Sequence, residues 1–454
     1  MSGGLMQLVA IGAQDMYLSY NPEITFFDTA HKTYTNFALE SMEQLFSGSL
    51  GWGGQATALL ARTGDLVSTM YLQLELPELR KEMFFSDMST PLATDTAAVH
   101  WTNSVGHAAI NYIQLTIGGV PIDKHYGRWL NIWDELTCKQ EHWNGRSEMI
   151  GRSVGLGGQE GLSYCSADKP KTLYVPLQFW FNRNVGAALP LVALQFHDVS
   201  IKVDLNPLNH LVVFVTSQND RVTTTGIDTM RIDNNAAPLE KCSLFVDYIY
   251  LDNDERQRFA RDDHMYLVEQ LQFNGQETIG DFQNATDKSI RLNFNHPTKE
   301  IIWTAQHSDC YKEGPGYNDW FNYSSAKAGD AGNAYDLLGT AQLRLNSHDR
   351  FSPARQASYF RLVQPANHHT RIPEKHIYCY SFALNPEEYQ PSGTCNFSRI
   401  DNAHLILRSS NKLPDVAPGT ATSWSDVQGR YEVWAWSLNQ LKVSGGLGGL
   451  QFAN

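Results

Sequence analysis

The alternation of hydrophobic and polar positions predicts β-strands along most of the chain. Short runs rich in β-branched and aromatic residues are separated by clusters of Gly, Pro, Asn and Asp. Many such runs with turns between them are typical of an all-β sandwich or barrel. The clearest runs are Leu66 to Leu76, Ile110 to Ile117, Tyr174 to Phe181, Val192 to Leu205 and Leu244 to Leu251.

Two segments have helical features instead. From Arg128 to Trp143, apolar residues recur at i, i+3, i+4 and i+7, which predicts a helix within a long loop. We expect Trp129 and Trp133 on its apolar stripe to pack over one end of a barrel. In the middle of the chain, Asp252 with Glu255 three residues later resembles the start of a capped helix. This second helix is charged on most sides, which predicts a solvated connector.

The strands on the two sides of this connector look like two copies of one unit. Several motifs recur in the same order, at spacings of 226, 228 and 201 residues. The smaller last spacing is explained if the helix-bearing loop around residues 128–170 is an insertion in the first copy. A tandem duplication is the favoured interpretation, and two unrelated β-domains are the alternative. The matched motifs are Glu43-Gln44-Leu45 before Gly48 with Glu269-Gln270-Leu271 before Gly275, Gln114-Leu115 with Gln342-Leu343, and Pro190 with Pro391.

Composition narrows the class of protein. The chain has 454 residues, 42% hydrophobic and 18% charged, which is ordinary for a globular protein large enough for two cores. Its formal charge is −13, and it has no long run of Lys or Arg, so we expect no direct contact with nucleic acid. The first eighteen residues lack the basic start and unbroken apolar core of a signal peptide, and no membrane span is expected. Six widely spaced cysteines predict mostly free thiols.

Several longer stretches resemble the major capsid proteins of nucleocytoplasmic large DNA viruses, with the algal-virus and marseillevirus types most similar. They extend from the first residues to the last part of the chain. The stretches are GGLMQLVAIGAQDMYL at the start, NPEITFF (21–27), IGGVPIDKHY (117–126), VDYIYLDNDERQRFA (246–260) and PSGTCNFSRIDNA (391–403).

The resemblance implies two tandem eight-stranded jelly rolls, an all-β double jelly roll with short helices in the loops and in the connector. The expected division is an N-terminal arm at 1–24, a first jelly roll at 25–251, a helical connector at 252–264 and a second jelly roll at 265–454. Within the arm, Leu5, Leu8 and Val9 are expected to contact neighbouring subunits or minor capsid proteins.

The implied function is structural, with no enzymatic activity and no cofactor. Homotrimers would form pseudo-hexagonal capsomers that tile the icosahedral shell of a large double-stranded DNA virus. The partners would be the chain itself, neighbouring trimers, and minor capsid and penton proteins, with an internal membrane nearby. Assembly is expected in the host cell cytoplasm, and the final location is the virion. The competing class is a two-domain β-sandwich enzyme or lectin.

Other chemistry receives weak support from the sequence. The usual hydrolase, zinc-protease, deaminase and nucleotide-binding motifs do not occur. His368 and His369, in a stretch expected to be a loop, with His376 nearby, could in principle bind a metal, but adjacent histidines point in opposite directions on a strand. The three N-x-[ST] sequons are candidate glycosylation sites, of which Asn322 is expected to be the most exposed; they are Asn284, Asn322 and Asn396.

Overall fold

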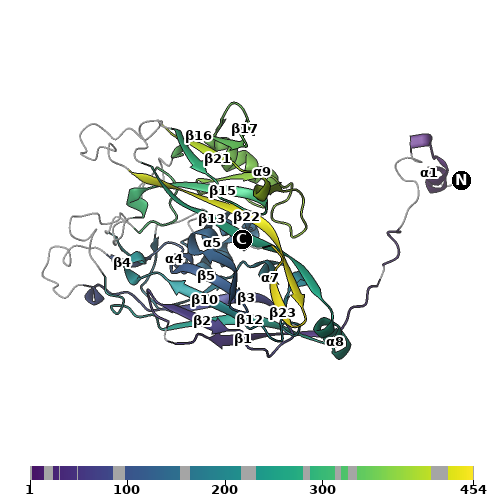
Figure 1. Ribbon diagram of the computed structural model, residues 1–454, viewed down its shortest axis with the longest axis horizontal. Helices are drawn as coiled ribbons and strands as arrows, with labels where there is room; N and C mark the ends of the chain where they lie inside the picture. Colours follow the sequence, from purple (N-terminus) through teal and green to yellow (C-terminus); the bar gives the residue numbers. More distant parts are fainter. Residues whose placement is uncertain are drawn as a thin grey trace. The chain divides into compact units, whose positions relative to one another are not determined.

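A computed structural model describes residues 3–14, 24–29, 31–48, 50–84, 98–153, 164–215, 232–279, 287–311, 318–325, 335–410 and 428–452. The chain consists of two units, residues 1–37 and residues 38–454. In the larger unit, antiparallel strands form two barrels, each with two facing sheets (Figure 1).

The first barrel is built from sheets with the strand orders β1-β12-β3-β8 and β2-β10-β5-β6. A smaller sheet, β11-β4-β7, and the short strand β9 beside β3 are added to it. The strands are β1 (Phe37–Leu45), β2 (Gln55–Leu59), β3 (Leu66–Leu76), β4 (Ala98–Thr102), β5 (Ile110–Ile117), β6 (Val120–Tyr126), β7 (Tyr164–Cys165), β8 (Lys171–Pro176), β9 (Leu189–Pro190), β10 (Val199–Leu205), β11 (Val212–Val215) and β12 (Lys241–Leu251).

The second barrel has the orders β13-β22-β15-β19 and β14-β21-β16-β17. The short strands β18, β20 and β23 extend these sheets. The strands are β13 (His264–Ile279), β14 (Asp287–Arg291), β15 (Pro297–His307), β16 (Leu338–Leu345), β17 (His348–Asp349), β18 (Arg355–Gln356), β19 (Ile377–Ser381), β20 (Cys395–Asn396), β21 (Ala403–Ser409), β22 (Gly429–Ser444) and β23 (Leu447–Leu450).

The two barrels have the same topology. The four-strand orders of the second barrel repeat those of the first, strand for strand in chain order, and this arrangement is a double jelly roll. The motifs matched in the sequence lie on equivalent strands: Gln114 is in β5 and Gln342 is in β16. Gly48 and Gly275 have φ values of +91° and +94°, a conformation that favours glycine. The topology therefore supports the tandem duplication over two unrelated β-domains.

Alternation along the strands places one face of each sheet in a core. In β3, Met70, Leu72 and Leu74 point into the core of the first barrel. In β15, Trp303 and Ala305 point into the core of the second. Fully burying such an apolar side chain stabilises the fold by roughly 1.5–3 kcal/mol, so this alternation fixes which face of each strand is inside.

Short helices lie in the loops and in the connector. The segment between β6 and β8 is longer than its counterpart between β17 and β19, in agreement with the expected insertion in the first copy. The helices are α1 (Gly3–Val9), α4 (Val105–Ala108), α5 (Gly127–Thr137), α6 (Trp143–Ile150), α7 (Trp180–Arg183), α8 (Asn253–Arg261) and α9 (Gln364–His368), with single turns η1 (Lys81–Met83), η2 (Gln140–His142), η3 (Val185–Ala187), η4 (Leu208–His210), η5 (Ser308–Cys310), η7 (Tyr359–Val363) and η8 (Phe397–Arg399).

The connector between the barrels is helix α8. Asp252 is its N-cap, with a side chain that accepts a hydrogen bond from the Asn253 backbone N–H. No residue of α8 is buried, as its charge pattern indicates.

Two of the predicted strands are partly wrong. The run Tyr174 to Phe181 leaves the sheet after Pro176, and α7 begins at Trp180 because Asn182 anchors this turn to the Ser68 carbonyl of β3. The strand predicted for Val192 to Leu205 begins only at Val199. Its first half forms turns in which Ala193 and Leu194 are buried without being in a strand, whereas Phe196 is 73% exposed, so apolar content alone was misleading.

All six cysteines lie within the described residues, and none is paired in a disulfide. Among the helices of the described ranges, none is both long and apolar enough to span a lipid bilayer.

Candidate functional site: the junction between the barrels

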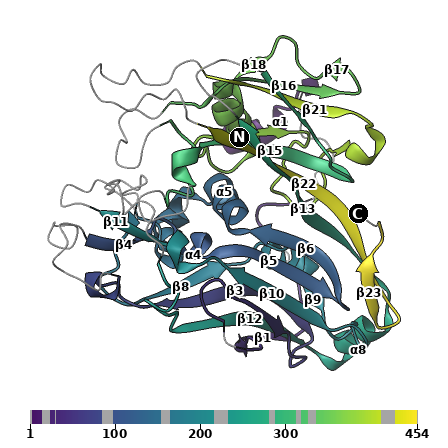
Figure 2. The same ribbon diagram turned by 60° about the vertical axis from the view of Figure 1, so that its left-hand side comes forward.

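Helix α5 lies between the two barrels, as both ribbon views show (Figure 1, Figure 2). It follows β6 directly, and its first residue, Gly127, allows a close approach: a Cβ there would lie 2.1 Å from the His107 carbonyl oxygen. Its apolar stripe is fully buried and contacts the outer face of the β13-β22-β15-β19 sheet. The stripe is Trp129, Ile132, Trp133 and Leu136, and the sheet residues are Ile302, Ile377, Cys379, Trp434 and Trp436.

Stacked indoles dominate this contact. Trp129 and Trp436 have ring centroids 5.4 Å apart with an interplanar angle of 21°, and Trp133 lies 5.0 Å from Trp436. Each such pair contributes about 0.5–1.5 kcal/mol beyond its buried area. The sequence predicted this helix and its stripe over a barrel end. The structure instead places the stripe against a sheet of the other barrel.

A buried ionic cluster also joins the barrels. The Lys299 ammonium in β15 donates to Glu269 Oε1 in β13 at 2.5 Å and to the Glu388 carbonyl at 2.7 Å. Glu269 also accepts from Arg183 of α7, which belongs to the first barrel. The side chains of Lys299 and Glu269 are 0% and 2% exposed, so each charge depends on its partner.

Two hydrogen bonds between backbone groups and side chains also connect the barrels. The backbone N–H of Leu271 in β13 donates to Asp123 Oδ1 in β6 at 3.1 Å. The Gln270 side-chain amide donates to the Ile122 carbonyl at 2.5 Å. The edge of β13 is thereby tied to β6 of the first barrel.

His369 is held between two carboxylates next to this cluster. Its Nε2 lies 2.9 Å from Glu300 Oε2, and its Nδ1 lies 2.9 Å from Glu387 Oε1. Burial alone would lower the pKa of His369, but the charge of Glu300 and hydrogen bonds to Cys379, Glu300 and Glu387 raise this pKa well above 6.5. The imidazole is therefore a buried cation with both nitrogens engaged.

The other two histidines that the sequence singled out lie in different settings. The stretch expected to be a loop forms helix α9 up to His368, whose Nδ1 contacts the Leu384 carbonyl. His376 faces Asp336 at 3.8 Å, and burial lowers its pKa to about 4. Within the described residues the three histidines are not brought together as one metal site.

A pH dependence of stability follows from His369. Because its folded pKa is raised, its stabilisation is complete below the ordinary value of 6.5 and is lost as the pH rises through the folded value. Across the neutral and alkaline range, we expect the melting temperature of the His369→Gln variant to lie furthest below that of the unmodified chain where the pH is under 6.5. The difference should shrink as the pH rises through the folded pKa of His369. Thermal melts across this range test the prediction. The exposed His348, replaced by Gln, is the control and should leave the pH profile unchanged.

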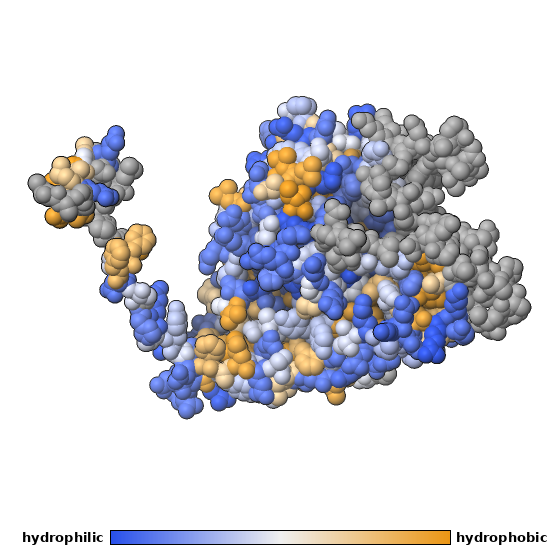
Figure 3. Space-filling model, turned by 180° about the vertical axis from the view of Figure 1, so that it is seen from behind, coloured by the Kyte–Doolittle hydropathy of each residue, from blue (hydrophilic) through white to orange (hydrophobic). Residues whose placement is uncertain are grey.

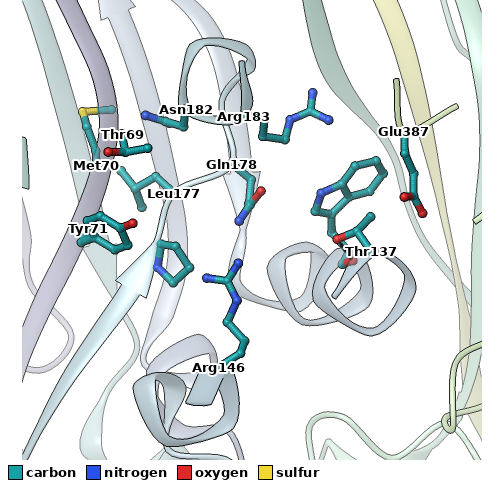
Figure 4. Close-up of a pocket in the computed structure, with 12 residues that line it drawn as sticks. Thr69, Met70, Tyr71, Thr137, Arg146, Leu177, Gln178, Asn182, Arg183 and Glu387 are labelled. Atoms are coloured by element: carbon teal, nitrogen blue, oxygen red, sulfur yellow. Dashed lines mark hydrogen bonds between the residues drawn. The ribbon is translucent and has the colours of Figure 1, made fainter. Parts of the chain in front are cut away.

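A pocket of about 300 Å³ opens beside the junction. Residues of both barrels and of α5 and α6 line it, and Figure 4 shows Gln178 and Arg146 pointing into the same space. Arg146 is paired with Asp134 at 3.2 Å, and Arg183 with Glu269, so these two cations are already neutralised. The lining is Thr69, Met70, Tyr71, Trp133, Thr137, Arg146, Pro176, Leu177, Gln178, Asn182, Arg183 and Glu387.

The N-terminal unit presents apolar side chains on its own helix. In α1, the side chains of Leu5, Leu8 and Val9 are 53%, 72% and 71% exposed. A short helix with three exposed apolar residues has no core of its own to bury them in.

The sequons differ in exposure from the expectation. Asn322 is half-buried, and its side-chain amide donates to Asp319 at 2.9 Å. Asn396, which precedes the turn η8, is exposed. Asn284 lies outside the described residues.

The family models match almost the whole chain. The model described as "Major capsid protein N-terminus" matches residues 25–252, and the model described as "Large eukaryotic DNA virus major capsid protein" matches residues 255–449. The chain belongs to this family of major capsid proteins. The two matches meet at α8, the helix between the barrels.

Relatives in this family match over their full length. The major capsid proteins of Pyramimonas orientalis virus and Paramecium bursaria Chlorella virus 1 are 39% and 37% identical to the chain, with 100% of each protein covered. The crystal structure of PBCV-1 VP54 matches with a TM-score of 0.73 and 30% identity over 95% of this chain and 100% of that one. The Faustovirus major capsid protein, at 14% identity and a TM-score of 0.68, shares the fold.

This major capsid protein is therefore a structural component of the virion shell of a large DNA virus and not an enzyme. The comparisons exclude the two-domain enzyme or lectin that the sequence left as a competing class.

Sequence reasoning missed the buried ionic groups. Glu269 was identified only as part of a repeated motif, and neither Lys299 nor Glu300 was predicted to lie in a buried ion pair. The available signal was their position: Lys299-Glu300 directly precedes Ile301-Ile302-Trp303 in one strand. Charges within a strand buried on both faces are paired.

Proposed function

We propose that three copies of the chain form a homotrimeric capsomer of pseudo-hexagonal outline, and that these capsomers tile an icosahedral shell around double-stranded DNA. The observation that carries the proposal is the shared strand order of the two barrels. Three chains contribute six similar units, so a closed three-fold oligomer can occupy a hexagonal lattice position. The similarity to VP54 and to the quasi-atomic model of the PBCV-1 capsid supports this assembly.

The proposal also assigns a role to each segment of the chain. Residues 1–24 would act as an arm, 25–251 and 265–454 as the two barrels, and 252–264 as their connector. The arm, through Leu5, Leu8 and Val9, would bind neighbouring subunits or minor capsid proteins, because exposed apolar side chains gain most from a partner. Penton proteins and an internal membrane would be further neighbours, and assembly would occur in the host cytoplasm. Of the sequons, Asn396 offers an accessible acceptor for a glycan.

The trimer makes a direct prediction for the purified chain. Size-exclusion chromatography with light scattering should give three times the 51.1 kDa chain mass. Negative-stain images should show particles with a hexagonal outline. A chain that stays monomeric at micromolar concentration would contradict the proposal.

A further inference from the structure

Both barrels carry a helical segment at the same topological position. Helix α5 follows β6 and precedes β8, and the continuous segment η7–α9 lies between the equivalent strands β17 and β19. One residue of each faces its own core: Leu130 in the first barrel and Phe360 in the second. These two residues are 230 positions apart, close to the 228 that separates Gln114 from Gln342.

At the same spacing, the junction stripe of α5 has a counterpart on η7–α9. Trp129, Ile132, Trp133 and Leu136 correspond to Tyr359, Leu362, Val363 and Ala366. The α5 stripe is buried against the other barrel. Three of the four counterpart residues are exposed: Leu362 and Val363 are 39% and 43% exposed, and Ala366 is exposed, whereas Tyr359 is half-buried.

The sheet that receives α5 also has a counterpart. In the second barrel, Ile302 of β15 is paired with Trp434 of β22 and Cys379 of β19. In the first barrel, β3 is the strand equivalent to β15, and its residue Tyr71 is the counterpart of Ile302.

Tyr71 is paired with Phe245 of β12 and Pro176 of β8. Tyr71 and Phe245 are half-buried, and the neighbouring Tyr174, whose ring is 6.2 Å from that of Phe245, is 39% exposed. The outer face of this sheet is thus an aromatic surface that α5 does not cover.

We propose that η7–α9 of one chain binds the outer face of the β1-β12-β3-β8 sheet of the next copy, in the way that α5 binds the β13-β22-β15-β19 sheet within a chain. Each barrel then supplies one helix and one sheet face. A contact between two different surfaces closes into a ring when its rotation divides a full turn, and three chains with two barrels each complete the ring. This inference rests on the proposed trimer and names the surfaces that form it.

Two further observations agree with this assignment. The pocket beside the junction has Thr69, Tyr71 and Pro176 in its lining, so it borders the proposed sheet face and is closed off by a helix bound there. On the face of the molecule seen in Figure 3, exposed apolar side chains form several separate groups, which fits contacts of limited size between folded chains.

The first experiment compares two identical substitutions at exposed valines. Val363→Asp places a carboxylate in the proposed contact, whereas Val120→Asp, at a site 54% exposed in the β5–β6 hairpin, is the matched control. A truncated hot spot costs about 2 kcal/mol or more, so each contact should weaken roughly 30-fold. Light scattering across a dilution series should show Val363→Asp as a monomer at concentrations where the unmodified chain and Val120→Asp are trimers.

The second experiment tests whether the two proposed surfaces lie close together in the trimer, and it uses variants that should still assemble. In the α5 contact, Trp133 lies against Trp436. Val363 is the counterpart of Trp133, and Asp247, two positions after Phe245 as Trp436 is two positions after Trp434, is the counterpart of Trp436. The equivalent pair across chains is therefore Val363 and Asp247. Oxidation of the double variant Val363→Cys/Asp247→Cys should give a covalent trimer on a non-reducing gel. The control Val120→Cys/Asp247→Cys should remain monomeric on the same gel.

The outcomes separate the two proposals. If the unmodified chain is a trimer but Val363→Asp assembles as tightly as Val120→Asp, or no covalent trimer forms, the assigned surfaces are wrong and the trimer stands. If the unmodified chain is a monomer, the proposed capsomer itself fails. Should Val363→Asp lose its folded circular dichroism spectrum, the cross-linking result alone decides.

Discussion

Replacing Trp129 with alanine is expected to lower the free energy of unfolding by about 3–5 kcal/mol. Its side chain is fully buried, and its ring stacks on Trp133 and Trp436, so truncation leaves a cavity between the barrels as well as removing these contacts. Urea denaturation at one fixed protein concentration measures the loss, because association also contributes to stability.

Two variants make this test specific. Phe452→Ala removes an aromatic ring that is 56% exposed, and its effect should stay within about 0.5 kcal/mol. Trp129→Phe keeps a ring in the junction and should lose less than Trp129→Ala. Equal effects of Trp129→Ala and Phe452→Ala would show that the helix contributes little to holding the barrels together.

Replacing Glu269 with glutamine is expected to have an effect of similar size, about 3–5 kcal/mol. The substitution leaves the Lys299 ammonium, which has no exposed surface, without its carboxylate, and also removes the anion that Arg183 contacts. The measurement is again the midpoint of urea denaturation.

A double variant separates loss of the pair from loss of packing. Glu269→Gln/Lys299→Met removes both buried charges and leaves only Arg183, which is 16% exposed, without an anion. It should therefore be more stable than Glu269→Gln alone. Additive losses from the two single substitutions would contradict a coupled ion pair.

Much of the fold could be predicted because strand alternation and the internal repeat are local signals. The strand predicted from Leu66 to Leu76 is β3, and the one predicted from Ile110 to Ile117 is β5. The repeat linked Gln114 to Gln342 before the strand order was known. Resemblance to the capsid family then supplied the architecture, two tandem eight-stranded jelly rolls.

The site was less predictable because its contacts join residues far apart in the chain. Periodicity gave the stripe of α5 but not its partner, since Trp129 and Trp436 are 307 positions apart. His369 could be noticed as one of two adjacent histidines, but its carboxylate partners Glu300 and Glu387 lie on other segments. Apolar runs such as Val192 to Leu205 misled because buried turns and strands have similar composition.

The distance in sequence between α5 and β22 also has a consequence for synthesis on the ribosome. The tryptophans of α5 emerge about 300 residues before the strand that covers them, which is one of the last of the chain. At roughly 5–20 residues per second, this leaves an apolar helix uncovered for roughly 15–60 s in each nascent chain. During translation the first barrel therefore exposes an apolar surface until β22 is made, and in that interval the nascent chain is open to aggregation through α5.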